Sequence, residues 1–135
     1  MRYWLVKSEP HDWSWSDQNS VESEPWTGVR NYQAQNHMRS MAKGDNVLFY
    51  HSGKTREIVG ICTVSRAEYP DPSDETGRWC LVDLKAKQAL REPVTLTAIK
   101  ADSNFADLAL VRQPRLSVMP ITEKAYSKII AMGGL

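Results

Sequence analysis

The sequence predicts one α+β domain spanning residues 1–135, a small, mostly antiparallel β-barrel flanked by short helices. Three observations lead to this fold class. The length is that of a single domain with a core of its own. Several short runs of branched and aromatic residues are separated by turns containing Gly, Pro, Asp or Ser, which is typical of strands. Stretches with helical spacing are few and short.

The first predicted strand covers residues 3–6, an aromatic and branched run that a charged, proline-containing segment ends. Lys7, Ser8 and Glu9 emerge together at this strand end, where a scaffold often presents functional groups. Residues 11–17 are rich in Ser and Asp and allow one helical turn, with a tryptophan packed against the core. A polar surface loop then leads to the most informative segment of the chain.

That segment, residues 26–36, combines groups that suit a flat ligand with polar edges. Trp26 and Tyr32 offer aromatic faces for stacking on a planar ring. Asn31 offers an amide that can read a donor and acceptor edge, and Arg30 can hold a phosphate or a carbonyl. The structural alternative is that the two aromatic residues are core anchors and that Arg30 is a surface cation.

A helix is predicted at 33–41 behind this segment, because Ala34, Met38 and Met41 recur at helical spacing. Residues 69–77 contain two prolines and predict a long polar loop that breaks the strand pattern. Further strands are predicted at 46–51, at 57–65 and at 115–120, and Gly60 marks a bulge in the second of these. Another strand is predicted at 79–84; it continues toward residue 90, and Pro93 ends it. Two more helices are predicted, a short one capped by Thr95 and a terminal one capped by Thr122.

Composition excludes some classes of function and leaves others open. The formal net charge is +1, so nucleic-acid binding would need a local basic patch or very few nucleotides. No apolar run approaches the roughly 20 residues that span a bilayer, and the chain opens directly into a strand-like segment, so we expect a cytoplasmic protein with no membrane contact. Cys62 and Cys80 lack metal-ligand spacing, so we expect buried apolar residues, no metal and no cofactor.

Catalytic patterns are weak. His51 and Ser52, with an aspartate from elsewhere, would be the members of a hydrolase triad, but adjacent strand residues point to opposite faces. No serine has the glycine pattern of a nucleophile elbow. The three histidines are scattered, without the spacing of a metal site. Nothing here requires catalysis, and we expect a protein that is not an enzyme.

The remaining chemistry suits recognition. Stacking is worth about 1–3 kcal/mol per base, so two rings and a satisfied edge would hold one splayed nucleobase. The candidate stacking rings are Trp26, Tyr32, Tyr50 and Trp79, the candidate edge readers are Ser8 and Asn31, and the candidate phosphate contacts are Lys7, Arg30, Lys54 and Arg115.

Five motifs, in chain order, resemble those of the EVE domain family and span nearly the whole chain. They are residues 4–10 (Trp-Leu-Val-Lys-Ser-Glu-Pro), 26–34 (Trp-Thr-Gly-Val-Arg-Asn-Tyr-Gln-Ala), Gly44-Asp45 leading to 49–52 (Phe-Tyr-His-Ser), 69–71 (Tyr-Pro-Asp) and 115–118 (Arg-Leu-Ser-Val). The resemblance implies a PUA-like fold, a compact β-barrel flanked by helices. It also implies a reader of modified nucleobases, with 5-methylcytosine and its oxidised forms as suggested DNA ligands and with RNA ligands also proposed.

The same resemblance implies where the ligand pocket lies. Its walls would be Lys7, Ser8, Glu9, Trp26, Arg30, Asn31 and Tyr32, bordered by Tyr50, His51 and Ser52, with Trp79 and the strand Arg115, Leu116, Ser117 and Val118 nearby. One departure is Gln35, where the family often carries Arg. This departure predicts one cation fewer near the groove and weaker phosphate contacts.

The leading hypothesis is therefore a non-catalytic nucleic-acid reader that holds one flipped or unpaired modified base, with methylated cytosine as the first candidate. One alternative is an enzyme acting on a modified nucleoside, with His51 or Glu9 as the acid or base. Another alternative is a module whose groove binds a small metabolite or a peptide. The sequence leaves open whether DNA or RNA is bound, which modification is preferred, and the oligomeric state.

The net charge generates the first testable prediction. Because few phosphates can be neutralised, nucleic-acid affinity should be modest and should fall only shallowly with salt concentration. Binding titrations over a series of salt concentrations measure this slope. A steep slope would contradict the expectation of a short contact with the nucleic-acid backbone.

Overall fold

The computed structural model describes all 135 residues and contains one six-stranded mixed sheet. The strands are β1 (Tyr3–Ser8), β2 (Glu24–Pro25), β3 (Asn46–His51), β4 (Glu57–Pro70), β5 (Cys80–Thr95) and β6 (Val118–Ile121). Their order in the sheet is β2-β5-β4-β3-β1-β6. Only β1 and β3 pair in parallel. The mostly antiparallel α+β class is confirmed, whereas the edge strands β2 and β6 do not pair to close a barrel.

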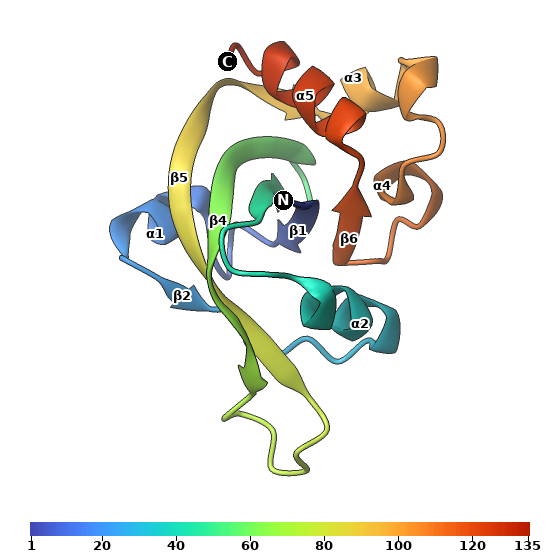
Figure 1. The fold of residues 1–135 in the computed structure, drawn as a ribbon. Helices are drawn as coiled ribbons and strands as arrows, with labels where there is room; N and C mark the ends of the chain where they lie inside the picture. The colour runs from blue at the N-terminus through green and yellow to red at the C-terminus, as the bar shows by residue number, and fades with distance from the viewer.

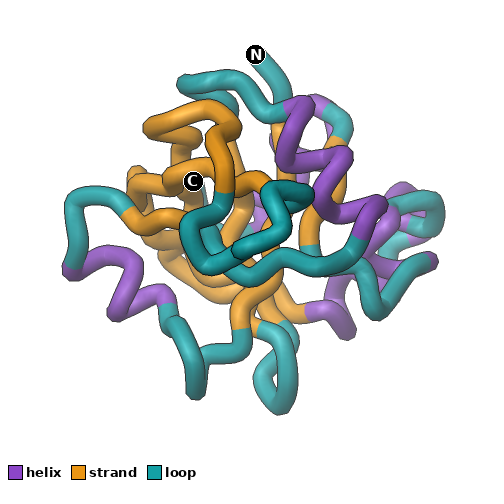
Figure 2. The backbone as a smooth tube through the Cα atoms, turned by 90° about the horizontal axis from the view of Figure 1, so that it is seen from below, coloured by secondary structure: helices purple, strands orange, loops and turns teal.

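Short helices surround the sheet (Figure 1). They are α1 (Trp15–Ser20), α2 (Tyr32–Ser40), α3 (Leu96–Lys100), the 3-10 helix η1 (Ser103–Phe105), α4 (Ala109–Arg112) and α5 (Glu123–Met132). Figure 2 shows the strands gathered in the middle of the molecule and the helices toward its outside. None of these helices is both long and apolar enough to cross a membrane.

The long hairpin of β4 and β5 gives the sheet its curvature. In Figure 1 both strands bend around β1, and the loop that joins them projects below the rest of the molecule. The pairing of β4 with β5 shifts register at four places. Each such irregularity bends the strand and increases its twist, so the hairpin wraps around the core instead of lying flat.

The core depends on the parallel pair β1 and β3. Trp4, Leu5 and Val6 of β1 are buried, because β3 and β6 flank the strand on its two edges. The buried carboxylate of Asp45 fixes the start of this arrangement. It accepts hydrogen bonds from the Trp4 indole N–H (3.0 Å) and from the backbone N–H of Ala42 (2.9 Å). The end of β1, four residues after Trp4, is thereby held in register with β3.

Two helix caps follow the predicted chemistry. The hydroxyls of Thr95 and Thr122 each accept a hydrogen bond of 3.1 Å from the backbone N–H three residues further on. The helix predicted at 33–41 is α2, displaced by one residue toward the N-terminus. The short helix α4 is absent from the prediction, and its first cap position, Leu108, provides no side-chain hydrogen bond that would have marked it.

Two strands are longer than predicted. β4 continues to Pro70, which pairs with Cys80 at the very end of the hairpin. β5 continues past Pro93, so the prediction that Pro93 ends the strand is wrong. The ladder passes from Ala89 to Val94 across a register shift, and Pro93 lies in the unpaired stretch between them. No ladder hydrogen bond needs the N–H that proline lacks there.

The two edges of the sheet also differ from the prediction. Residues 24–25, expected in a surface loop, form β2. The last strand, expected at 115–120, starts only at Val118 and continues through Pro120 to its end at Ile121. Because β6 is an edge strand, a proline within it is tolerated.

Gly60 lies at a β-bulge, as predicted, and its neighbours explain why a glycine stands there. The register between β3 and β4 shifts beside it. A Cβ atom at position 60 would lie 2.5 Å from the ring of Trp15. Trp15 therefore packs directly on the glycine, and its ring meets Phe49 edge-on with the centres 5.4 Å apart. The backbone N–H of Trp15 also donates a hydrogen bond to Nε2 of His51 (2.9 Å), which positions the start of α1.

We expect Gly60→Ala to lower the free energy of unfolding by about 1–3 kcal/mol, because the new methyl group displaces the Trp15 ring. Urea unfolding of the parent and the variant measures this cost. In a Trp15→Ala background the same substitution should cost much less. An equal cost in both backgrounds would contradict the assignment of Trp15 as the obstacle.

Candidate functional site

A cleft of about 430 Å³ opens at the end of β1. One wall is the end of β1 with the residues that follow it, and the other is β2 with the loop that leads to α2. The lining residues are Lys7, Ser8, Glu9, Asp12, Trp13, Glu24, Pro25, Trp26, Thr27, Gly28, Val29, Arg30 and Ser117. This volume lies in the range of sites for small ligands, about 300–1,000 Å³.

Lys7 is held in the cleft wall at both of its ends. Its backbone N–H donates to the carbonyl oxygen of Ser117 (2.9 Å), and its Nζ donates to that of Pro114 (2.8 Å). Nζ also lies 5.6 Å from the centre of the Tyr50 ring. Partial burial lowers the pKa of Lys7. Lys7 therefore ties the 114–117 segment to the cleft with an ammonium group that already has a protein acceptor.

Ser8 and Glu9 shape the opposite side of the same strand end. The Ser8 hydroxyl donates to the carbonyl oxygen of Trp13, which draws the segment after β1 back onto the strand. The Glu9 carboxylate lies against Gly53, in space that a side chain at position 53 would occupy. Gly53 also has a φ of +85°, which favours glycine.

Trp26 provides the aromatic wall. Its backbone N–H donates to the carbonyl oxygen of Val82 (2.9 Å), which extends the pairing of β2 with β5 by one residue. Its ring meets the fully buried Phe49 edge-on, with centres 5.8 Å apart and an angle of 82° between the rings. Trp26 is thus half-buried, with its ring supported by the core and part of its surface in the cleft.

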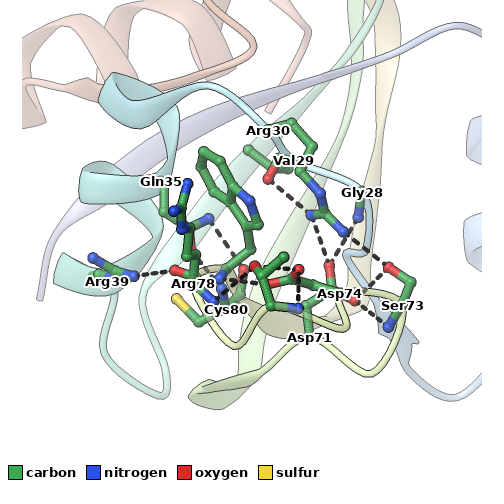
Figure 3. A network of polar contacts seen from close by, with 12 residues as sticks. Gly28, Val29, Arg30, Gln35, Arg39, Asp71, Ser73, Asp74, Arg78 and Cys80 are labelled. Atoms are coloured by element: carbon green, nitrogen blue, oxygen red, sulfur yellow. Dashed lines mark hydrogen bonds and ion pairs between the residues drawn. The ribbon is translucent and has the colours of Figure 1, made fainter.

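Asp71 fastens the cleft loop to the hairpin loop (Figure 3). Its Oδ2 accepts hydrogen bonds from the Gly28 N–H (3.0 Å) and from Nη1 of Arg30 (3.2 Å). Its Oδ1 accepts from the N–H (2.8 Å) and hydroxyl (2.6 Å) of Ser73. Burial by itself would raise the pKa of Asp71, but these hydrogen bonds outweigh burial and hold the pKa below its usual 3.8. Gly28 has a φ of +82°, which a glycine adopts without strain.

Charge in the cleft is predominantly negative. Its carboxylates are Glu9, Asp12 and Glu24, and its cations are Lys7 and Arg30. Both cations already contact protein acceptors. Burial, and then the negative charge of Asp83, raises the pKa of Glu24. The interior therefore suits a ligand edge with hydrogen-bond donors better than it suits a phosphate group.

The structure brings together part of the predicted site. The predicted residues that line the cleft are Lys7, Ser8, Glu9, Trp26, Arg30 and Ser117. Three others, Asn31, Arg115 and Leu116, line a separate hollow with Gln33, Gln113 and Pro114. Tyr50 and Val118 are buried in the core and have at most 2% of their surface exposed.

His51 and Ser52 hold elements together beside the cleft. Nε2 of His51 accepts the Trp15 N–H, and burial lowers the pKa of the imidazole, with Glu57 and Glu9 opposing that shift. A neutral His51 thus anchors α1. The Ser52 N–H donates to the carbonyl oxygen of Ser8 (2.9 Å), which continues the pairing of β1 with β3 into the turn.

Asn31 and Gln35 have structural tasks at α2. Oδ1 of Asn31 caps the helix by accepting the Ala34 N–H (2.9 Å), which leaves the Nδ2 donors and one lone pair of Oδ1 for a ligand. Gln35 is buried, and its amide bonds both the N–H and the carbonyl oxygen of Cys80 (Figure 3). Gln35 does not line the cleft, and the expectation of weaker phosphate contacts stays a prediction. Cys62 and Cys80 are buried, as predicted.

Tyr32 and Trp79 pack on each other outside the cleft. Their ring centres lie 5.0 Å apart, with 35° between the ring planes. Trp79 lines a hollow beside the hairpin loop, and Tyr32 has 67% of its surface exposed. Arg30 lies between this pair and the cleft, with its guanidinium carbon 5.6 Å from the centre of the Trp79 ring.

Several residues that line the cleft or support its surroundings were not predicted from the sequence. Asp12 and Glu24 line the cleft but stand in segments with no recognisable pattern. Asp71 lies in the Tyr-Pro-Asp motif, and that motif was the available signal for its role. Gln18 is fully buried. It accepts the Trp13 indole N–H (2.9 Å) and donates to a β5 carbonyl oxygen (3.0 Å), and nothing local in the sequence marks it.

The family model described as the EVE domain matches residues 2–132. The chain belongs to the EVE domain family. Its curved sheet with peripheral helices is accordingly PUA-like. The chain is similar to the solved structure of Rpa0253 from Rhodopseudomonas palustris, with a TM-score of 0.95, 48% identity, and coverage of 99% of this chain and 94% of that one.

The proteins similar to this chain include thymocyte nuclear protein 1 from several animals. The one from Rattus norvegicus is 29% identical over 165 residues, which cover 96% of this chain and 73% of the relative. Human THYN1 has been solved in complex with DNA containing 5-methylcytosine. This EVE domain matches it with a TM-score of 0.92 and 26% identity, over 100% of this chain and 99% of that one.

We expect Asp71→Asn to lower the free energy of unfolding by about 1–3 kcal/mol near neutral pH, because a buried acceptor of several hydrogen bonds is weakened. The folded pKa is depressed, so the contribution of Asp71 is present above pH 3.8 and is lost as pH falls through the folded value. The difference between parent and variant should therefore shrink as the pH is lowered below about 4. Urea unfolding across this range measures it, and a constant difference would contradict the role of the ionised carboxylate.

Proposed function

We propose that this EVE domain is a non-catalytic reader of modified bases in nucleic acid. In this proposal the cleft at the end of β1 holds one flipped or unpaired base, with 5-methylcytosine or a related modified cytosine as the first candidate. The observation that carries the proposal is the combination of a supported tryptophan, Trp26, with carboxylate acceptors in one cleft of suitable volume.

The chemistry of cytosine fits this lining. Its exocyclic N4 amino group is a hydrogen-bond donor, and Glu and Asp carboxylates are its usual protein acceptors. Glu9, Asp12 and Glu24 supply such acceptors. Pro25 and Val29 add apolar surface to the same lining, which suits a methyl group on the base. The negative interior also favours entry of a base over entry of a phosphate.

The relative solved with 5-methylcytosine DNA adds support from outside the chain. Human THYN1 has the same fold over the whole of this domain. A base inside a duplex has to leave the stack before it can enter such a cleft, which costs a few kcal/mol. The cost is smaller for a base that is already unpaired, so single-stranded or mismatched sites are the favoured ligands in this proposal.

The non-catalytic part of the proposal is supported by how the candidate acid–base groups are used. His51 has its Nε2 engaged by the Trp15 N–H and is neutral, so it neither lines the cleft nor offers a proton to it. Glu9 packs on Gly53 at an exposed strand end. Neither residue forms a hydrogen-bonded pair with a nucleophile.

Replacement of Trp26 tests the cleft. Trp26→Ala should weaken binding of a single-stranded oligonucleotide carrying one 5-methylcytosine by roughly 5- to 150-fold, the equivalent of about 1–3 kcal/mol of stacking. Fluorescence anisotropy of the labelled oligonucleotide measures the affinity. The matched variant Trp26→Phe keeps an aromatic face and should recover most of it.

Two results would overturn the proposal. One is an affinity of Trp26→Ala equal to that of the parent protein, which would show that the base does not bind in this cleft. The other is equal affinity of the parent protein for oligonucleotides with cytosine, 5-methylcytosine and 5-hydroxymethylcytosine, which would remove the reader role. Thermal unfolding of each variant verifies that a loss of binding does not come from a loss of the fold, since Trp26 also contacts Phe49.

A further inference from the structure

The pair of Tyr32 and Trp79 is not explained by the fold or by the cleft. Tyr32 is the first residue of α2, and among the large apolar side chains that are exposed it is the only aromatic one. Its ring covers part of Trp79 without contributing to the core. An exposed tyrosine stacked on a half-buried tryptophan is an aromatic platform open to solvent.

The platform is held in place from beneath. Oδ2 of Asp74 accepts the Trp79 N–H (2.8 Å), and Oδ1 of the same carboxylate accepts the N–H and hydroxyl of Thr76. These hydrogen bonds fix the end of the hairpin loop on which Trp79 stands. Cys80, the next residue, is held by Gln35 of α2, the same helix that carries Tyr32. The two rings therefore come from segments that are bonded to each other.

Arg30 connects the platform with the cleft. It lines the cleft, and its guanidinium lies against the Trp79 ring. A guanidinium group has five N–H donors. Nη1 uses two of them on the Val29 carbonyl and Asp71, and Nη2 uses one on Ser73. The Nε donor and one Nη2 donor remain for a ligand, and the side chain is partly exposed.

We propose that Tyr32 and Trp79 form a second base-stacking site, for the nucleotide next to the one held in the cleft, with Arg30 contacting the phosphate that links the two. This inference rests on the proposed function and extends it from one base to two adjacent nucleotides. Stacking on exposed aromatic rings is tolerant of sequence, because every base has a π-face. The cleft then selects the modified base, while the platform adds affinity and fixes the direction of the strand.

Charge supports a nucleotide over an apolar peptide as the occupant. Arg30 lies against the Trp79 ring, and two further cations, Arg39 and Arg78, line the hollow beside it together with one carboxylate, Glu68. Figure 3 shows Arg39 bonded to the Arg78 carbonyl oxygen. Cations beside aromatic rings suit a base with its phosphate. If this surface instead binds a peptide, the abasic site in the test below should lower the affinity of the parent and of Tyr32→Ala by the same factor.

The test is a double-mutant cycle between the protein and the oligonucleotide. The probes are short single strands with one 5-methylcytosine and either a base or an abasic site at the adjacent position, on the 5′ side and on the 3′ side in turn. For the parent protein, the abasic site on one of the two sides should lower affinity about fivefold or more. Tyr32→Ala should bind the intact strand with an affinity lowered by a similar factor. Its affinity for the abasic strand should be less than about twofold lower than its affinity for the intact strand.

Matched variants separate stacking from other effects. Tyr32→Phe keeps the ring and should keep the response to the abasic site. Tyr3→Ala removes one ring from another stacked tyrosine pair, Tyr3 with Tyr126, whose centres lie 4.2 Å apart and which does not line the cleft. It should respond to the abasic site as the parent does. Thermal unfolding confirms that each variant is folded.

The outcomes for the two proposals are distinct. If the parent protein prefers 5-methylcytosine but Tyr32→Ala responds to the abasic site as the parent does, the platform inference is overturned and the reader function stands. If the parent shows no preference for the modified base, or binds no oligonucleotide, the proposed function fails and the platform inference fails with it.

Discussion

A single buried carboxylate, that of Asp71, constrains the part of the molecule that forms the cleft. Burying a charge is costly unless it is fully paired, so the groups that bond Asp71 have little freedom to move away. Those groups come from the loop between β2 and α2 and from the loop between β4 and β5. Their union places Trp26 over the core and holds Arg30 between the cleft and the Tyr32–Trp79 pair. The long, curved hairpin of β4 and β5 carries the loop between these strands toward the loop between β2 and α2 (Figure 1).

What the sequence predicted well was local. Strand runs, the caps at Thr95 and Thr122, and the bulge at Gly60 follow from spacing and side-chain chemistry within a few residues. The limits of strands were less predictable, because whether a proline ends a strand depends on the partner strand. Pro93 is accommodated where the ladder with β4 is interrupted, and no local pattern reveals that interruption. Pro120 is tolerated within β6 because that strand lies at the edge of the sheet, and edge position is likewise a property of the whole sheet.

The candidate site was predictable in part, for the same reason. The end of β1 and the segment from Trp26 to Arg30 meet in one cleft, as their motifs implied. The sequence placed position 35 near the groove and His51 at its border, but each of these side chains satisfies a backbone group distant in sequence. Aromatic residues pose a similar difficulty, since composition does not tell whether a ring meets the core, another ring or a ligand. Trp26 and Tyr32 are six positions apart, yet one rests on Phe49 and the other is exposed.

The parallel pairing of β1 with β3 has a consequence for how the site comes into existence. Parallel neighbours need a long crossover between them, and here that crossover, residues 9–45, carries one entire wall of the cleft. The other contributions come from residues 71–73 and 114–117. Closure of these loops has to precede any binding surface, so a fragment that ends before residue 114 would lack part of the site. The cleft is therefore a property of the completed topology and not of any one segment of the chain.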